Sequence, residues 1–217
     1  MSSIRVIPTE AGEARLHADR SRYPTAALAL GHGAGRGVDS PDLVALATAL
    51  PRHGISVFRI EQPWVVAGRK VAPRPAILDV ATIACLNAIR VRTPLVIGGR
   101  SAGARSACRV GRSMGAVGCL ALAFPLHPPG RTEPSRLSEL CDAGLPTLVV
   151  QGERDALGTP DEFPESIALA VIPEADHGFA VPRKAALDQE QTLALVVEAV
   201  LEWVTARIAR PTARNGG

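Results

Sequence analysis

Apolar residues along this chain occur in two alternating patterns, short continuous runs and longer stretches with helical spacing, and the alternation begins at Ala26. Runs short enough for buried strands lie at residues 26–30, 55–60, 94–99, 118–124, 147–151 and 166–173. Helical spacing is found at residues 42–50, 76–91, 102–114, 135–143 and 184–208. Strands that are apolar throughout and alternate with helices are typical of a parallel sheet. The pattern therefore predicts an α/β fold whose mostly parallel central sheet is covered by helices on both faces.

Two of the expected helices have an apolar face. The helix at 76–91 is expected to bury Ile77, Val80, Ala84, Leu86 and Ile89. The last helix is expected to bury Leu193, Val197, Val200, Leu201, Val204 and Ile208. The segment 62–75 contains three prolines, which favour an ordered loop.

The composition favours one globular domain. Of the 217 residues, 47% are hydrophobic, which is enough for a sizeable core. We expect a single domain over residues 1–209 and a disordered tail over 210–217. The four cysteines contain no C-x-x-C pair, so they are expected to be buried free thiols and not metal ligands: Cys85, Cys108, Cys119 and Cys141.

Charge and hydropathy exclude several classes of partner. The 24 Lys and Arg residues against 21 Asp and Glu give a net charge of only +3, and 3% of residues are aromatic, so no nucleic acid is expected to bind. No stretch approaches the roughly 18 apolar residues of a membrane span, and the N-terminal residues mix charges throughout. We therefore expect a cytoplasmic protein without a membrane partner. Nothing in the sequence indicates an oligomeric state.

The segment Gly99-Arg100-Ser101-Ala102-Gly103 matches G-x-S-x-G and lies between an expected strand and an expected helix. In that setting the motif is typical of a sharp turn that lifts the serine hydroxyl clear of the sheet. Glycines two residues to either side have no Cβ to collide with the neighbouring strand and helix. The motif predicts that Ser101 is a nucleophile.

A serine hydroxyl becomes a good nucleophile only when a base accepts its proton. In this architecture the chain order is serine, acid, histidine, and the histidines after Ser101 are His127 and His177. His177 follows the last expected strand and is the predicted base. His127 precedes the expected acid and is a candidate for lining the pocket.

The acid that orients the base should lie on the same sheet edge. Asp155 closely follows the expected strand at 147–151 and is therefore the predicted acid. The other acidic residues nearby are better explained as capping, surface or salt-bridging groups: Glu153, Asp161, Glu162 and Asp176.

The glycine-rich turn at 31–37 follows the first expected strand. It fits neither G-x-G-x-x-G nor the phosphate-binding G-x-x-x-x-G-K-[ST], so a nucleotide is not expected. Such a turn can supply a backbone N–H to a developing oxyanion, with Ala34 as the first candidate and Gly33 as the second, while Ala102 supplies the other N–H. His32 is expected to orient this turn.

Taken together, the chain resembles the α/β-hydrolase superfamily. The resemblance covers roughly residues 26–209 and is carried, in chain order, by LGHGAGRGVDSP, FRIEQPW, PLVIGGRSAGAR, FPLHPPG, LVVQGERDALGT and EADHGF. Two of these segments, HGAG…DSP and FPLHPPG, are similar to the small uncharacterised hydrolases related to testis-expressed protein 30 and to the hydrolase-like domain of non-specific lethal complex subunit 3. The resemblance implies a nucleophile at Ser101, an acid at Asp155, a base at His177 and no separate lid domain.

Two functions remain open at this point. The first is a serine hydrolase that cleaves small carboxylic esters or thioesters without a cofactor. The second is a non-catalytic scaffold of the same fold that serves protein interaction, because a fold alone does not establish an activity. The presence of all three triad residue types favours the enzyme.

Little chain is left to cover Ser101 once the sheet and helices are assigned. The expected rim is 62–75 together with 125–134, and it includes Trp64 and His127. Arg69, Lys70, Arg74 and Arg100 would make the rim partly basic, although a solvated basic face also explains them. A shallow site predicts a preference for short acyl chains.

Overall fold

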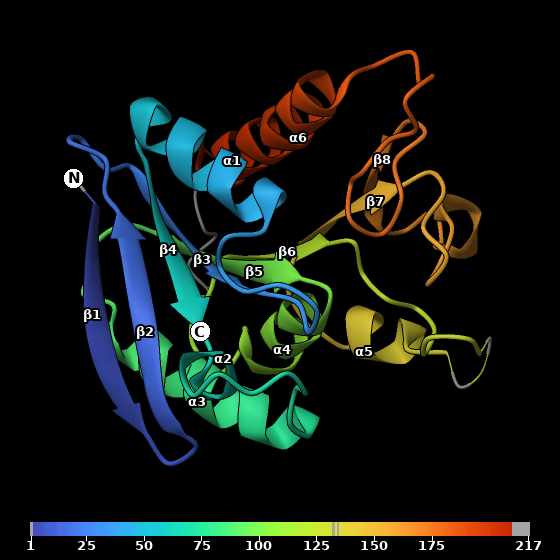
Figure 1. Cartoon of the computed structure of the whole chain (residues 1–217). Coiled ribbons are helices and arrows are strands. Elements are labelled where there is room, and N and C mark those ends of the chain that lie inside the picture. Colours follow the sequence, from blue (N-terminus) through green and yellow to red (C-terminus); the bar gives the residue numbers. More distant parts are fainter. Residues whose placement is uncertain (1, 132, 134, 210–217) are drawn as a thin grey trace, which may run out of the picture.

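The computed structural model describes residues 2–131, 133 and 135–209, so the predicted tail at 210–217 lies outside the described residues. In this part of the chain, eight strands form one sheet in the order β1-β2-β4-β3-β5-β6-β7-β8 (Figure 1). The strands are β1 Ser2–Thr9, β2 Gly12–Asp19, β3 Ala26–Gly31, β4 Ile55–Glu61, β5 Leu95–Arg100, β6 Gly118–Leu122, β7 Thr147–Gly152 and β8 Ala168–Ile172. Along the sheet from β4 through β3 to β8, neighbouring strands are parallel. Strand β2 is antiparallel to both β1 and β4. The predicted fold class is confirmed.

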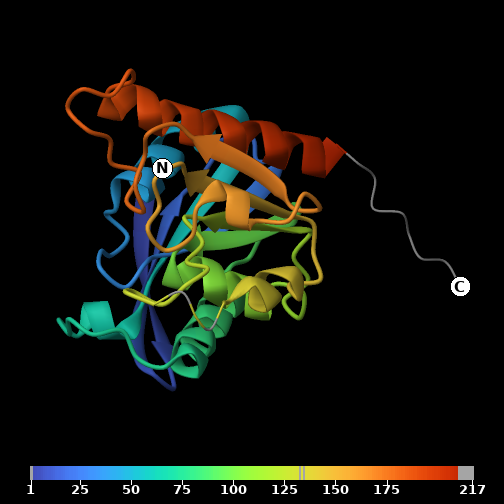
Figure 2. The same ribbon diagram turned by 90° about the vertical axis from the view of Figure 1, so that its right-hand side faces the viewer.

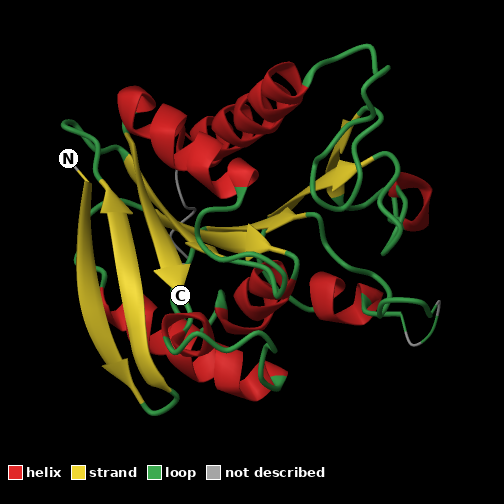
Figure 3. Cartoon of the chain, viewed as in Figure 1, coloured by secondary structure: helices red, strands yellow, loops and turns green. Residues whose placement is uncertain are grey.

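Helices cover both faces of the sheet (Figures 2 and 3). The α-helices are α1 Pro41–Ala49, α2 Pro63–Val66, α3 Pro75–Ala88, α4 Ala102–Val110, α5 Leu137–Cys141 and α6 Gln189–Ala209, and the 3-10 helices are Leu50–His53 and Pro160–Glu162. On one face α1 and α6 pack together against the sheet, and on the other face lie α3, α4 and α5 (Figure 1). No segment of the described chain forms a separate lid domain. None of the helices in the described residues is long and apolar enough to cross a membrane.

The antiparallel hairpin β1–β2 is absent from the sequence prediction. Strand β1 lies at the sheet edge, and its apolar residues Ile4 and Val6 are exposed, so it lacks the continuous apolar run of a buried strand. Strand β2 buries Ala14, Leu16 and Ala18 in alternation with polar residues. This period of two, typical of a strand with one solvated face, was the available signal.

Two helices differ from their prediction in face or length. Helix α3 buries Leu78, Ala81, Thr82, Cys85 and Leu86, whereas Ile77 and Val80 are exposed. Helix α6 begins at Gln189, five residues later than expected, and buries Thr192, Val196, Val200 and Val204. Both helices carry apolar residues on more than one face, and the packing against the sheet selects which of them are buried.

Two smaller expectations also change. The expected loop 62–75 contains the short helix α2, which begins at Pro63, a residue suited to a first helical position. Three of the cysteines are buried free thiols as predicted, but Cys141 is exposed at the end of α5.

Candidate active site

The serine of the G-x-S-x-G motif lies in the one-residue turn between β5 and α4. The backbone of Ser101 has φ 53° and ψ −112°, a conformation that residues other than glycine rarely adopt. Its N–H donates to the carbonyl of Leu122 on β6 at 2.9 Å. The turn therefore keeps Ser101 at the carboxyl edge of the sheet at a cost of about 1–3 kcal/mol of backbone strain.

The expected reason for the motif's glycines is confirmed. A Cβ on Gly103 would lie 2.4 Å from the carbonyl of Gly31, and one on Gly99 would lie 2.6 Å from that same oxygen. Strands β3 and β5 and the start of α4 thus approach one another through backbone alone. This contact explains why the turn after β3 lies beside the serine.

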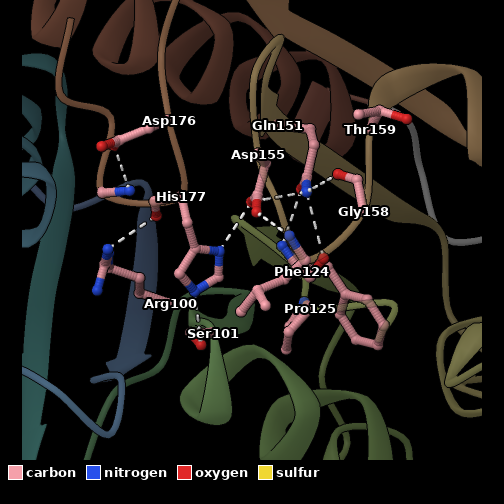
Figure 4. A network of polar contacts seen from close by, with 12 residues as sticks. Arg100, Ser101, Phe124, Pro125, Gln151, Asp155, Gly158, Thr159, Asp176 and His177 are labelled. Carbon is pink, nitrogen blue, oxygen red and sulfur yellow. Dashed lines mark hydrogen bonds and ion pairs between the residues drawn. The ribbon is translucent and has the colours of Figure 1, made fainter. Parts of the chain in front are cut away.

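The structure brings Ser101, His177 and Asp155 into one hydrogen-bonded chain (Figure 4). His177 Nε2 lies 3.0 Å from Ser101 Oγ, and His177 Nδ1 lies 2.8 Å from Asp155 Oδ2. The three residues come from the loops after β5, β8 and β7, so widely separated parts of the sequence meet at one sheet edge. The side chain of His177 is 25% exposed, which leaves the imidazole accessible from solvent.

Asp155 is fully buried and accepts three hydrogen bonds. The N–H of Leu157 donates to Oδ1 at 2.8 Å, and Oδ2 accepts from Gln151 Nε2 at 2.9 Å as well as from His177. These contacts fix the plane of the carboxylate and direct Oδ2 at the histidine.

Gln151, which the sequence analysis did not single out, is fully buried at the end of β7. Its Oε1 accepts from the N–H of Phe124 at 2.9 Å, and its Nε2 donates to Asp155 and, at 2.8 Å, to the carbonyl of Gly158 (Figure 4). A polar residue that ends an otherwise apolar strand was the signal that could have indicated this role.

Replacing Gln151 with methionine, which is similar in length but lacks polar groups, is expected to destabilise the fold. Partners of the amide, including the N–H of Phe124 and the carbonyl of Gly158, would stay buried without their hydrogen bonds, at about 1–3 kcal/mol each. Urea unfolding of the two proteins measures the change. A loss below about 1 kcal/mol would show that the amide is not needed to satisfy these groups.

The other histidine after Ser101, His127, and the other acids considered from the sequence lie outside the hydrogen-bonded chain. His127 Nε2 contacts the Glu162 carboxylate, and Glu162 also closes a capping box with Thr159. Asp176 Oδ1 accepts from the N–H groups of Gly178 at 2.7 Å and Ala180 at 2.9 Å, so it shapes the loop that carries His177. Of the other two acids, Asp161 lies exposed in the 3-10 helix Pro160–Glu162, and Glu153 accepts from the N–H of Glu174 at 2.6 Å.

The glycine-rich turn is held by His32, as its predicted orienting role requires. His32 is buried, with its ring centroid 4.9 Å from that of Trp64, and Nε2 accepts from the N–H of Gln62 at 3.1 Å. Nδ1 therefore carries the proton and donates to the carbonyl of Gly33 at 2.8 Å. A Cβ on Gly33 would lie 3.3 Å from Ser101 Cβ, so the turn lies directly against the serine.

Acidification is expected to destabilise the fold through His32. Burial lowers the pKa of His32 from its ordinary value of 6.5, against smaller opposing contributions from the hydrogen bond to Gly33 and the charge of Glu61. The unfolded chain thus binds the proton more tightly, and stability falls by up to about 1.4 kcal/mol per pH unit as the pH drops from 6.5 towards the folded-state pKa.

Urea unfolding of the wild type and of His32→Gln at about pH 7.5 and about pH 5.5 tests this linkage. The difference in unfolding free energy between the two pH values should be smaller in the variant. An equal difference in both proteins would assign the acid sensitivity to other groups.

The predicted rim changes in two places. Arg100 is buried and pairs with Asp42, so it does not contribute to a basic surface, whereas Arg69, Lys70 and Arg74 are exposed. Trp64 is buried against His32 and lines a cavity of about 450 Å³ with residues that include Glu13 and Arg69. Trp64 is therefore linked to Ser101 indirectly. It packs against His32, which bonds to the glycine-rich turn, and that turn lies against the serine.

Solved structures with the same fold cover nearly the whole chain. A Xanthomonas campestris protein, described as an α/β serine hydrolase without lid, has a TM-score of 0.73 and 18% identity over 93% of this chain and 94% of its own. Est1E from Butyrivibrio proteoclasticus has a TM-score of 0.72 and 14% identity over 96% and 100% of the two chains. Dienelactone hydrolase from Anabaena variabilis has a TM-score of 0.72 and 16% identity over 95% and 97%. These similarities concern the fold.

Comparison with curated protein sequences found no match. The model of one protein family, the alpha/beta hydrolase domain, matches residues 24–205, which span the sheet from β3 to β8 and nearly all of α6. The chain belongs to the alpha/beta hydrolase domain family.

Proposed function

We propose that this protein is a serine hydrolase that cleaves small carboxylic esters or thioesters through an acyl-enzyme. The observation that carries the proposal is the hydrogen-bonded chain from Ser101 Oγ through His177 to the buried carboxylate of Asp155. Nucleophile, base and orienting acid have the contacts that acyl transfer requires. Family membership and fold neighbours that include a serine hydrolase support the same class.

In the first half-reaction Ser101 Oγ attacks the substrate carbonyl while His177 Nε2 accepts the hydroxyl proton. The imidazolium that forms is stabilised by Asp155, which accepts the hydrogen bond from Nδ1. The tetrahedral intermediate collapses, the bond to the alcohol or thiol breaks, and Nε2 returns the proton to that leaving group. Water then attacks the acyl-Ser101 ester by the same proton transfers and releases the carboxylic acid. Each step uses side chains of this protein and water, so no cofactor is required.

Two backbone N–H groups are proposed to stabilise the oxyanion. Ala102 occupies the first position of α4, where an N–H has no partner within the helix. The second N–H comes from the glycine-rich turn at Ala34, or at Gly33, whose backbone lies against Ser101. In other enzymes, removal of one such donor costs about 3–4 kcal/mol of transition-state stabilisation.

Short acyl chains are the expected substrates. Ser101 and His177 are partly exposed, and a shallow site offers a long acyl chain few apolar contacts. The test is kcat/KM for acetyl, butyryl and palmitoyl p-nitrophenyl esters and for an acetyl thioester. We expect a preference for acetyl over palmitoyl, because a shallow site binds little of a long acyl chain.

A clear palmitoyl preference would contradict the shallow site. The acetyl ester and the acetyl thioester, which share the acyl group, separate the two substrate types. We also propose that the chain is related to the small uncharacterised hydrolases similar to testis-expressed protein 30, a relationship that implies the same nucleophile, acid and base but no substrate.

A further inference from the structure

Arg100 is the last residue of β5 and directly precedes Ser101. Its side chain is only 9% exposed, although a guanidinium is among the most strongly polar groups in a protein. A cation is seldom buried in this way unless it is paired. The surroundings of the three guanidinium nitrogens therefore indicate what the residue does.

The three nitrogens face three separate segments around the site. Nη2 donates to the main-chain carbonyl of His177 at 2.8 Å, as Figure 4 shows. Nη1 lies 3.2 Å from the position that a Cβ of Gly33 would occupy, against the glycine-rich turn. Nε lies 3.4 Å from Asp42 Oδ2, in the first turn of α1.

Asp42 is suited to anchor this cation. Its side chain is fully buried, and it lies at the N-terminal end of α1, where the helix dipole favours a negative charge. Burial raises the pKa of Asp42, while the charge of Arg100 and the hydroxyl of Ser40 act in the opposite direction. The pair connects α1 to the strand end that carries the serine.

We infer that Arg100, held by Asp42, is a positioning residue that fixes the His177 loop and the glycine-rich turn relative to Ser101. The inference rests on the proposed function, since it assigns a role within that same site. The guanidinium donates a hydrogen bond from Nη2 to the His177 carbonyl and forms an ion pair, without a hydrogen bond, between Nε and Asp42. Its planar group holds these nitrogens in fixed directions, which a lysine ammonium on a flexible chain cannot reproduce. Misplacement of a catalytic group by about 1 Å can lower a rate by about 10²-fold.

The experiment compares two double variants that each remove a buried or half-buried arginine–aspartate pair. Asp42→Asn with Arg100→Met removes the pair described above without leaving an isolated buried charge. Asp79→Asn with Arg109→Met is the control for a lost ion pair. Arg109 in α4 binds Asp79 at 2.7 Å and also pairs with Glu139, which keeps Arg105 as a partner at 2.6 Å. In the described residues, Arg109 makes no contact with the His177 loop. Arg100→Lys tests whether charge alone is sufficient.

Two measurements are made on each protein, amide hydrogen exchange over residues 173–182 and p-nitrophenyl acetate hydrolysis. For the Asp42/Arg100 variant we expect faster exchange in this loop and a kcat about 10²-fold lower, with KM changed much less. The control should retain loop protection and kcat, whatever its melting temperature. Arg100→Lys should also have a lower kcat and faster loop exchange than the wild type.

Unchanged loop exchange in the Asp42/Arg100 variant, or equal losses of kcat in the variant and the control, would overturn the inference. Wild-type kcat and loop exchange in Arg100→Lys would also overturn it, because the guanidinium geometry would then be dispensable. Hydrogen exchange does not depend on turnover. An inactive wild type would therefore count against the proposed hydrolase function, while the exchange comparison would still decide whether Arg100 positions the loop.

Discussion

Replacing Ser101 with alanine is expected to lower kcat for p-nitrophenyl acetate by about 10⁴-fold or more, since the variant has no nucleophile to form the acyl-enzyme. The fold should be unaffected. The recorded side-chain partner of the hydroxyl is His177, which remains partly solvated, and alanine retains the Cβ and the backbone conformation at φ 53°. Circular dichroism and urea unfolding check the fold, and steady-state kinetics measures the loss.

Ser113→Ala is the matched control for this variant. Ser113 lies just beyond the end of α4, is exposed, and donates to the carbonyl of Val110 at 2.8 Å, so the same chemical change occurs away from His177. The control should retain wild-type kcat. Substantial turnover by a folded Ser101→Ala protein would mean that another group performs the attack.

The second large effect is expected for Asp155→Asn, with a loss of about 10⁴-fold in kcat. Both carboxylate oxygens accept hydrogen bonds, Oδ1 from the N–H of Leu157 and Oδ2 from Gln151 and His177. An asparagine must turn its NH₂ group towards one of these sides. If the NH₂ faces the N–H of Leu157, two donors oppose each other. If it faces His177, it favours the imidazole tautomer with the proton on Nε2, and that nitrogen cannot then accept the serine proton.

Asp176→Asn provides a control one residue from the base. Asp176 Oδ1 accepts from Gly178 and Ala180, and an asparagine keeps an oxygen that can accept both bonds. Its kcat should stay within about threefold of wild type, because surface substitutions usually have small effects. If Asp176→Asn were the damaging change and Asp155→Asn harmless, the acid would be Asp176.

The sequence predicts the parts of the fold that are governed by burial on both faces. The strands from β3 to β7 are nearly continuous apolar runs, and their parallel order follows from the helices between them. The edge hairpin β1–β2 and the orientation of α3 escape this reasoning. In β1, Ile4 and Val6 face solvent, and β2 buries small and apolar residues only at alternate positions, so neither strand has a continuous apolar run. In α3, apolar residues lie on more than one face, and tertiary packing decides which of them are buried.

The arrangement of Ser101, Asp155 and His177 follows from chain order, because each residue comes after a parallel strand and those strands end at one edge. The supporting contacts do not follow from such a rule. Arg100 reads as a surface cation in the sequence, and only the fold places it between Asp42 and the carbonyl of His177. Gln151 is the intermediate case, since a glutamine that ends an apolar strand already requires buried partners.

Reaction with a fluorophosphonate tests the central claim most directly, because this reagent phosphonylates a serine only when a base activates the hydroxyl. Intact-mass and peptide analysis after labelling should show one adduct per chain, located on Ser101. The adduct should be absent from Ser101→Ala and should form far more slowly in His177→Ala. A folded wild-type protein that stays unlabelled, or an adduct on another residue, would contradict the account of Ser101 as an activated nucleophile.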